Sequence, residues 1–529
     1  MSRTGFDHEV AIVGAGFSGM GAAIALDRAG LTDWLMLEAA GEIGGTWRDN
    51  RYLGACCDVP SHLYSFSFDL NPDWSHRFSP ASEIHAYQQR VRDKYRLGDR
   101  IRYRFEAVSA DYSAGGWVVR SSEGEELRVR YLVTAVGALR IPHKPEFAGL
   151  DRFRGKVMHS AEWDHDFDPR GKRVIVIGSA ASAVQIIPQL TRVVERLTVM
   201  QRTANYLIAR RDRKISGFEQ RMFRTLPLVQ RVFRWRQYVV NDFLFHANFT
   251  GKASLRKSLV RWLVRRHMKH QVRDPVLLGK LTPGYEIGCK RLLLSDDYLP
   301  AIQRDNVELV TEGVDHFGEH SLVTGSGREI EADLVVLATG FETVKFFGNL
   351  EINGPNGVSL KQAWEEEIRA HRSVVVKEFP NFFMMFGPNS GLGHSSIIVM
   401  LEAQARYIAQ LLCEARDSGK STILVRPEAE ASYNQELQKA LQTTVWNSGC
   451  NSWYLDDKGR NFALWPHTTT RFISEMRHVR LGEYRFFNDD RQVDPDHRPH
   501  GGLQQSIIVG GRHAGEIDFR TSRKDKPAP

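Results

Sequence analysis

The sequence lacks long apolar runs and contains few cysteines. No uninterrupted apolar segment approaches the ~20 residues that a membrane-spanning helix needs, so we expect no integral membrane segment. The first residues lead into a strand pattern without a charged leader or an apolar signal core, which predicts a cytoplasmic protein. Five cysteines, an odd number in 529 residues, fit a reducing compartment. No Cys-x-x-Cys redox pair is present, and we expect no metal site.

The positive charge is concentrated in one segment. The chain has a net charge of +8, and residues 211–283 alone carry 17 Lys and Arg against four Asp and Glu. Apolar residues alternate with these charges at helical spacing, which predicts a basic helical insertion. Two interpretations are open: helices that lie on a membrane surface, and solvated helix faces that steer an anionic cofactor. We favour the second, and no nucleic-acid-binding motif accompanies the charge.

A glycine-rich loop follows the first apolar strand pattern, residues 9–13. The loop reads Gly14-Ala15-Gly16-Phe17-Ser18-Gly19 and opens a helical pattern. Such a loop lets the backbone approach a dinucleotide pyrophosphate, which then lies at the helix N-terminus. The next strand, residues 34–37, ends on Glu38, whose carboxylate is placed to accept hydrogen bonds from a ribose 2′-hydroxyl. This unit predicts an FAD site.

A second loop repeats the pattern after the strand at residues 173–177. It reads Gly178-Ser179-Ala180-Ala181-Ser182-Ala183, so alanines replace the second and third glycines. The strand that follows ends on Gln201 and Arg202, at the same offset at which the first unit has Glu38. A guanidinium here is placed to bind a ribose 2′-phosphate. The second nucleotide should therefore be NADPH.

These units predict an α/β fold with two Rossmann-like dinucleotide-binding domains and a helical insertion. Strands that end in small residues, near residues 131–137 and 332–340, fit backbone that crosses close to a dinucleotide. A further strand at residues 382–386 and a helix at 397–412 suggest that the chain returns to the first domain. The expected domains are FAD-binding, 1–145 and 338–529; NADPH-binding, 146–210 and 284–337; and the basic insertion, 211–283.

Between the two loops lies a motif with five specified positions. They are Phe153, Gly155, His159, Trp163 and Asp164. This spacing resembles the fingerprint of the Baeyer–Villiger monooxygenases, F-x-G-x-x-x-H-x-x-x-W followed by Pro or Asp. Related flavin monooxygenases that oxidise nitrogen and sulfur usually have Tyr or Phe where Trp163 stands. The resemblance implies that His159 holds the linker between domains.

Two other stretches resemble the same family. The first contains Gly44-Gly45-Thr46-Trp47, Tyr52, Gly54 and Asp58, and departs from the family at Leu53, usually proline, and Cys56, often arginine. The resemblance implies that FAD is lined by Glu38, Thr46, Trp47, Asp58, Tyr64 and Val108. The second stretch is Tyr285 to Arg291. Here Lys290 would join Arg202 on the 2′-phosphate, and Arg291 would be the active-site arginine, oriented by Asp58.

The resemblance implies NADPH- and O₂-dependent insertion of oxygen beside a ketone carbonyl, through a C4a-peroxyflavin, to give an ester or lactone. The expected partners are a ketone and dioxygen. Three alternatives stay open: a flavin monooxygenase that oxygenates sulfur or nitrogen, a flavin disulfide reductase, and a membrane-recruited binding protein without catalysis. The cysteine spacing argues against the disulfide reductase. The sequence does not predict the size of the ketone or the oligomeric state.

Overall fold

The computed structural model describes most of the chain. It covers residues 5–488, except residues 252, 343, 344, 346, 448, 450, 451, 453 and 457. The chain divides at Asn488, and the C-terminal unit, residues 489–529, lies outside the described residues. The last part of the segment predicted to complete the FAD domain is therefore not described.

The first sheet has a five-stranded parallel part and a mixed part, in which β5 pairs antiparallel with β6 and β4, and β17 pairs parallel with β4. Five parallel strands lie in the order β18-β6-β1-β2-β3, and β4, β5 and β17 extend the sheet beyond β6. The strands are β1 (His8–Val13), β2 (Trp34–Glu38), β3 (Ile101–Tyr103), β4 (Ala107–Ser113), β5 (Gly116–Ser121), β6 (Glu126–Thr134), β17 (Glu351–Asn353) and β18 (Phe382–Met384). Because β18 pairs with β6, residues 382–384 return to the sheet that residues 8–13 begin.

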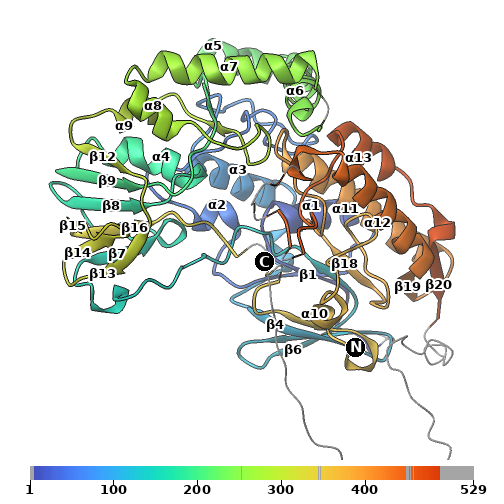
Figure 1. The fold of residues 1–529 in the computed structure, drawn as a ribbon. Coiled ribbons are helices and arrows are strands. Elements are labelled where there is room, and N and C mark those ends of the chain that lie inside the picture. The colour runs from blue at the N-terminus through green and yellow to red at the C-terminus, as the bar shows by residue number, and fades with distance from the viewer. Residues whose placement is uncertain are drawn as a thin grey trace, which may run out of the picture. The chain divides into compact units, whose positions relative to one another are not determined.

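The second sheet repeats this order. Its five parallel strands run β12-β9-β8-β16-β7, and a separate antiparallel sheet, β13-β14-β15, lies in the same part of the chain (Figure 1). The strands are β7 (Lys156–His159), β8 (Arg173–Ile177), β9 (Arg196–Met200), β12 (Val307–Val310), β13 (Val314–Phe317), β14 (Ser321–Thr324), β15 (Glu329–Glu331) and β16 (Leu334–Leu337). Strand β8 takes the central place that β1 has in the first sheet. The predicted α/β fold with two Rossmann-like domains is confirmed.

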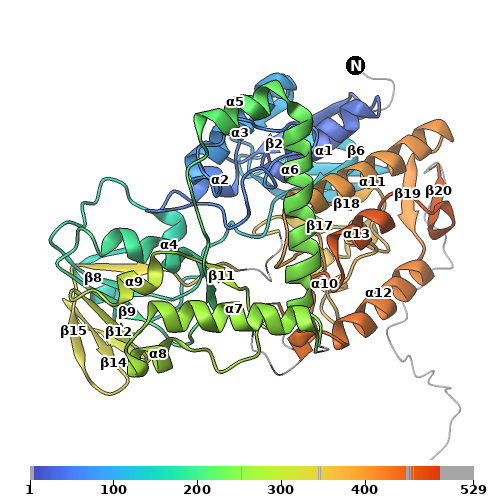
Figure 2. The ribbon, with the colours of Figure 1, turned by 90° about the horizontal axis from the view of Figure 1, so that it is seen from above.

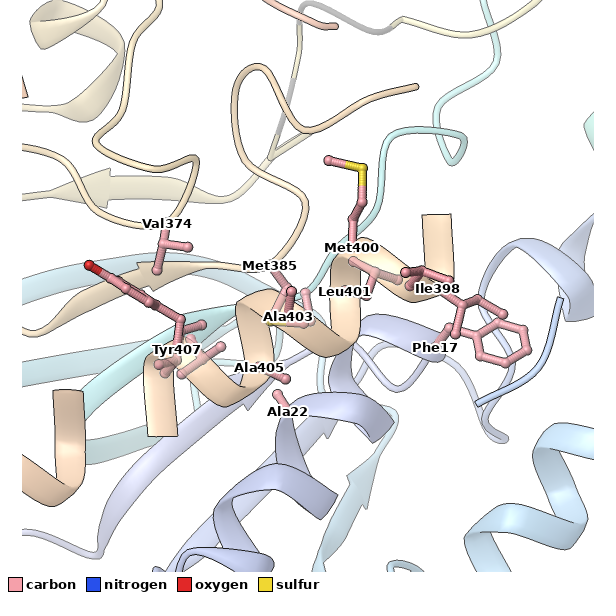
Figure 3. Packing of buried hydrophobic residues seen from close by; sticks show 14 of the residues in the cluster. Phe17, Ala22, Val374, Met385, Ile398, Met400, Leu401, Ala403, Ala405 and Tyr407 are labelled. Carbon is pink, nitrogen blue, oxygen red and sulfur yellow. The ribbon is translucent and has the colours of Figure 1, made fainter. Parts of the chain in front are cut away.

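Two helices form the centre of the largest core. Helix α1 (Phe17–Arg28) follows the first glycine loop, and α11 (Ile397–Asp417) packs against it. Figure 3 shows Ala22 of α1 facing Ala405 of α11, both of them buried. Small side chains at this contact let the helix axes approach closely. The helix predicted at 397–412 is therefore confirmed and is one turn longer.

The predicted basic insertion consists of helices (Figure 2). They are α5 (Gly217–Thr225), α6 (Pro227–Val240), α7 (Leu255–Gln271) and α8 (Pro275–Leu281), with a π-helical turn at Asn241–Phe245 after α6. Ser216 and Glu219 form a capping box that starts α5, and the Ser254 hydroxyl caps α7. These caps satisfy backbone N–H groups that the first helical turn leaves unpaired.

The other elements connect these layers. They are α2 (Thr46–Asp49), α3 (Ala81–Lys94), α4 (Ala181–Leu190), α9 (Tyr298–Ile302), α10 (Leu360–Ala363), α12 (Pro427–Gln442), α13 (Thr469–Glu475), and the paired strands β10 (Leu207–Ile208) with β11 (Leu293–Leu294) and β19 (Thr422–Val425) with β20 (Tyr484–Phe487).

Candidate active site and nucleotide sites

The first glycine loop makes a tight turn that only glycine can occupy. Gly14 has φ +109°, and a Cβ atom there would lie 2.6 Å from the Ala135 carbonyl oxygen. A Cβ on Gly19 would lie 1.9 Å from the Gly14 carbonyl oxygen. Helix α1 begins after Gly16 without a side-chain cap, so its first N–H groups point into the pocket that the loop borders. This geometry suits an anionic phosphate.

A large pocket extends from this loop. Its cavity volume is about 210 Å³. Its lining runs from the glycine loop past the end of β2 to α2 and to the start of α11. Eight of the predicted cofactor residues line it: Gly14, Gly16, Phe17, Ser18, Glu38, Thr46, Trp47 and Tyr64. Trp47 donates from its indole nitrogen to the Tyr64 hydroxyl at 3.1 Å, which fixes both rings.

Glu38 lies at the end of β2 with its carboxylate already oriented. One oxygen accepts from the Ala15 N–H at 2.9 Å, and the other accepts from the Ala40 N–H at 3.0 Å and from Arg48 Nη1 at 2.8 Å. Arg48 also lines the pocket and was not predicted from the sequence, although it directly follows Trp47 in the matched stretch. The oxygen that accepts from Ala15 keeps a lone pair for a ribose hydroxyl.

Three of the residues predicted to bind FAD do not line this pocket. Gly19 packs inside the loop turn, and Asp58 lies at the arginine site described below. Val108 lies in β4 where the pairing with β5 shifts register, and its neighbours Glu106 and Ala107 line the pocket instead. The role predicted for Val108 remains a prediction.

The second glycine loop uses the same backbone geometry as the first. Gly178 has φ +123°, and a Cβ there would lie 2.3 Å from the Ala338 carbonyl oxygen, as Gly14 meets Ala135. Ala180 and Ala181 are exposed where α4 begins, and no side chain caps this helix. Ser179 donates to the Thr203 carbonyl at 2.9 Å and accepts from Asn205, a residue that the sequence did not single out. The uncapped helix start offers its N–H groups to an anion.

Two cations lie near the end of β9. Burial lowers the pKa of Lys290, and the positive charge of nearby Arg202 lowers it further. Two like charges held together are stabilised when an anion binds between them. Lys290 also lies 5.3 Å from the centre of the Tyr285 ring. Gln201, in contrast, is 3% exposed, and its amide donates to the Lys280 carbonyl at 2.9 Å.

Arg291 and Asp58 form an ion pair between segments 233 residues apart. Arg291 Nε and Nη2 each lie 2.7 Å from Asp58 Oδ2, and Nη1 points to the Leu392 carbonyl at 3.5 Å. Attraction to the Asp58 carboxylate raises the pKa of Arg291 above its already high ordinary value. The Arg291 side chain keeps 36% of its surface exposed, so the cation is fixed in orientation but open on one side.

His159 of the fingerprint lies beside a pair of linker segments. His159 ends β7, is 1% exposed, and accepts from the Ala161 N–H at 3.1 Å. Its ring meets the Phe341 ring edge to face with centroids 6.0 Å apart. Phe341 in turn pairs with Pro142 in an antiparallel bridge, and the His143 N–H donates to the Gly340 carbonyl at 2.9 Å. His159 thus packs against Phe341, which belongs to one of the two linker segments that pair here.

The matched stretch before Asp58 packs on the second glycine unit. The amide of Gln185 in α4 accepts from the Tyr52 hydroxyl at 3.0 Å and donates to the Cys56 carbonyl at 3.0 Å. A Cβ on Gly54 would lie 2.6 Å from the Gln185 carbonyl oxygen. Gln185 therefore holds this turn, in which Leu53 replaces the usual proline.

The cysteines include free thiols, as a reducing compartment predicts, and one residue in a disulfide bond, which the sequence analysis did not predict. Cys56 and Cys57 are free, and Arg210 Nη1 lies 2.8 Å from Cys56 Sγ. Burial raises the pKa of the Cys56 thiol to about 11. Cys289, next to Lys290, is disulfide-bonded. A count of cysteines does not predict this bond, because it depends on which chain segments the fold brings together.

The described residues contain no candidate for a metal site or for a membrane-spanning helix. No group of His, Cys, Asp or Glu in residues 5–488, outside the gaps, is arranged to hold a metal ion. Within the same described part, no helix has both the length and the apolar character to cross a bilayer.

Comparisons with known proteins agree with the geometry. A family model described as pyridine nucleotide-disulphide oxidoreductase matches residues 11–225, which include both glycine loops. A Baeyer–Villiger monooxygenase of Streptomyces coelicolor is 43% identical over 90% of this chain and 92% of its own. One of Pseudomonas aeruginosa is 39% identical over 90% and 91%. A solved structure of an oxidized steroid monooxygenase bound to NADP is 29% identical, covers 91% of this chain and 99% of its own, and has a TM-score of 0.81.

Proposed function

The chain belongs to the Baeyer–Villiger monooxygenases, and we propose that it uses FAD, NADPH and dioxygen to insert oxygen beside the carbonyl of a ketone. The observation that carries this proposal is the fixed Arg291–Asp58 pair, because the chemistry needs a permanent cation near developing negative charge. The fingerprint with Trp163 supports a ketone in preference to sulfur or nitrogen as the oxygenated group.

The residues around the two loops fit the two nucleotides. The uncapped start of α1 and the oriented Glu38 carboxylate suit the pyrophosphate and ribose of FAD. The uncapped start of α4, with Arg202 and Lys290, suits NADPH and its 2′-phosphate. The linker pair at Pro142 and Phe341 supports the proposed domain boundaries near residues 145 and 338.

Bound flavin, once reduced by NADPH, supplies the activation of dioxygen. The chain itself must then bind the ketone and stabilise the negative charge that develops on the reacting oxygens. Arg291 cannot lose its proton in this role, because attraction to Asp58 raises its pKa and a guanidinium has no neutral form at working pH. Asp58 holds two of its nitrogens, and the third lies 3.5 Å from the Leu392 carbonyl oxygen. Asp58 is thus a positioning residue, and Arg291 the proposed catalytic residue.

Substrate choice tests the proposed function directly. Purified protein is expected to be yellow and to consume NADPH faster when a ketone is added, with one ester formed per NADPH consumed. Amine and sulfide substrates assayed side by side separate this activity from the heteroatom oxygenation that remains the second candidate. Stimulation by amines alone, with no ester from any ketone, would contradict the proposal.

Cofactor preference is expected to depend on Arg202. Hydrogen bonds to charged groups contribute about 1.5 to 3 kcal/mol each, so Arg202→Ala should raise KM for NADPH about tenfold to a hundredfold. KM for NADH should hardly change, because NADH has no 2′-phosphate. Steady-state kinetics with both cofactors measure this. Arg192→Ala, an exposed arginine after α4, is the matched control; an equal loss with both cofactors would show that Arg202 does not bind the phosphate.

A further inference from the structure

The insertion exposes an unusual number of large apolar side chains. Among the described residues, 17 large hydrophobic residues are exposed, and 13 of them lie between residues 218 and 276. These are Phe218, Leu226, Leu228, Val229, Val232, Trp235, Val239, Val240, Phe243, Leu255, Leu259, Trp262 and Val276. A concentration of this kind marks a surface that binds something apolar.

Helix α6 has its apolar side outward. Leu228, Val232, Trp235 and Val239 recur at helical spacing along one stripe, and their exposed fractions are 71%, 55%, 63% and 38%. An ordinary surface helix turns such a stripe toward the core. This stripe faces solvent instead, so its apolar character is not explained by folding of the described chain.

The opposite side of α6 packs against the protein and includes polar side chains. Gln230 is 3% exposed and donates to the Asn71 carbonyl at 2.6 Å. Arg234, one turn later, donates to the Ser65 carbonyl at 3.3 Å. These contacts fix the rotation of the helix, because turning it over would leave buried polar groups without partners.

Helix α7 repeats the outward stripe along its first half. Leu255, Leu259 and Trp262 are 91%, 47% and 53% exposed, while Val260 and Val264 on the other side are buried. Figure 1 shows α5, α6 and α7 together along the top of the molecule, and Figure 2 shows α6 and α7 meeting at a corner. The helices that carry the two stripes therefore lie in one layer of the fold.

Positive charge surrounds these stripes. Residues 211–283 have 17 basic and four acidic residues, a net charge of +13, so the remainder of the chain carries −5 of the total +8. Arg231 and Arg236 flank the stripe of α6, and Arg265 and Arg266 continue that of α7. All four are exposed, and none makes an ion pair with any residue that the structure describes.

We propose that α5, α6 and α7 form a face that binds the surface of a bilayer containing anionic lipids. Apolar stripes flanked by arginine, with Trp235 and Trp262 among the apolar residues, match helices that lie in the headgroup region. Basic residues near such a surface add attraction to anionic lipid. The association is peripheral and does not depend on the reaction that the enzyme catalyses.

Charge disfavours two other occupants of this face. A second copy bound through the same face would bring +13 against +13. The C-terminal segment 489–529 has seven acidic and seven basic residues, so its net charge of zero offers no complement. An anionic bilayer is the occupant that satisfies both the apolar stripes and the charge.

Flotation of the full-length holoenzyme with vesicles tests the proposal. The protein is expected to float with vesicles of phosphatidylcholine and phosphatidylglycerol at low salt, and far less with pure phosphatidylcholine. The double variant Val232→Glu/Trp235→Glu should bind the anionic vesicles at least about tenfold more weakly. Leu481→Glu, at a residue 47% exposed outside the insertion, is the control and should bind like the wild type. Circular dichroism confirms that each variant is folded.

Four results would overturn the proposal. The first is no flotation with either kind of vesicle, and the second is equal flotation of the double variant and the wild type. The third is binding to anionic vesicles that the double variant retains and that soluble polyglutamate abolishes. That result would point to an acidic protein partner recognised by charge alone. Sedimentation without vesicles covers self-association: a dimer that the double variant loses would assign the face to a second copy.

Discussion

Replacing Arg291 by alanine is expected to lower the rate of ester formation by about two to three orders of magnitude, because one preorganised partner of a developing oxyanion contributes about 2.7 to 4 kcal/mol. Flavin reduction depends on how NADPH is held, so it should persist in the variant. The expected protein binds FAD, oxidises NADPH and releases hydrogen peroxide instead of ester. Product analysis and a peroxide assay on the same reaction measure both outcomes.

Two companion variants separate charge from orientation. Asp58→Ala should lose less activity than Arg291→Ala, because the guanidinium stays charged but loses the carboxylate that holds Nε and Nη2. Arg304→Ala removes an exposed arginine and should leave ester yield unchanged. A near-normal ester yield from Arg291→Ala would assign the chemistry to another residue.

The nucleotide loops could be predicted from the sequence because their requirements are local. Gly14 and Gly178 each need a positive φ and space for a carbonyl oxygen from the strand that crosses behind them. Both requirements appear in the sequence as a glycine directly after an apolar strand, and the crossing strands end in small residues, Ala135 and Ala338. The position of each loop between a strand and a helix follows from these patterns.

The contacts between distant segments could not be predicted in this way. Gln185 joins α4 to the turn before Asp58 across 133 residues, and no spacing rule selects it from the other glutamines. Arg48 reaches Glu38 only because α2 folds back onto the end of β2. The pair of Arg291 with Asp58 was anticipated through family resemblance, since neither residue type nor spacing identifies it.

The side of each helix that faces the core could not be predicted from the sequence either. The sequence predicted basic, amphipathic helices at 211–283, and the structure contains them. Periodicity alone does not reveal which side a helix turns inward, and the usual assumption places the apolar side in the core. In α6 the polar Gln230 and Arg234 find buried backbone carbonyls as partners, and this reverses the assumption.

Gly16→Val is expected to yield a folded protein that purifies without FAD. A Cβ on Gly16 would meet no atom closer than 3.9 Å, so the fold itself has room for a side chain. That space belongs to the pocket that we assign to FAD, where a branched side chain would meet the pyrophosphate. Overpacking costs about 1 to 3 kcal/mol or more, which corresponds to FAD binding weaker by about tenfold to a hundredfold.

A substitution at Gly16 separates loss of FAD from loss of fold better than a substitution at Gly14 or Gly19 does. Valine at Gly14 or Gly19 would clash with backbone oxygens at 2.6 and 1.9 Å, so missing flavin there could reflect a collapsed loop. Gly313→Val is the matched control, because a Cβ on Gly313 would meet nothing within 4 Å and Gly313 lies away from the pocket. Flavin absorbance per protein and circular dichroism measure the two properties independently. Full FAD content in folded Gly16→Val would contradict the assignment of this loop to the pyrophosphate, since the side chain and the cofactor would then occupy different space.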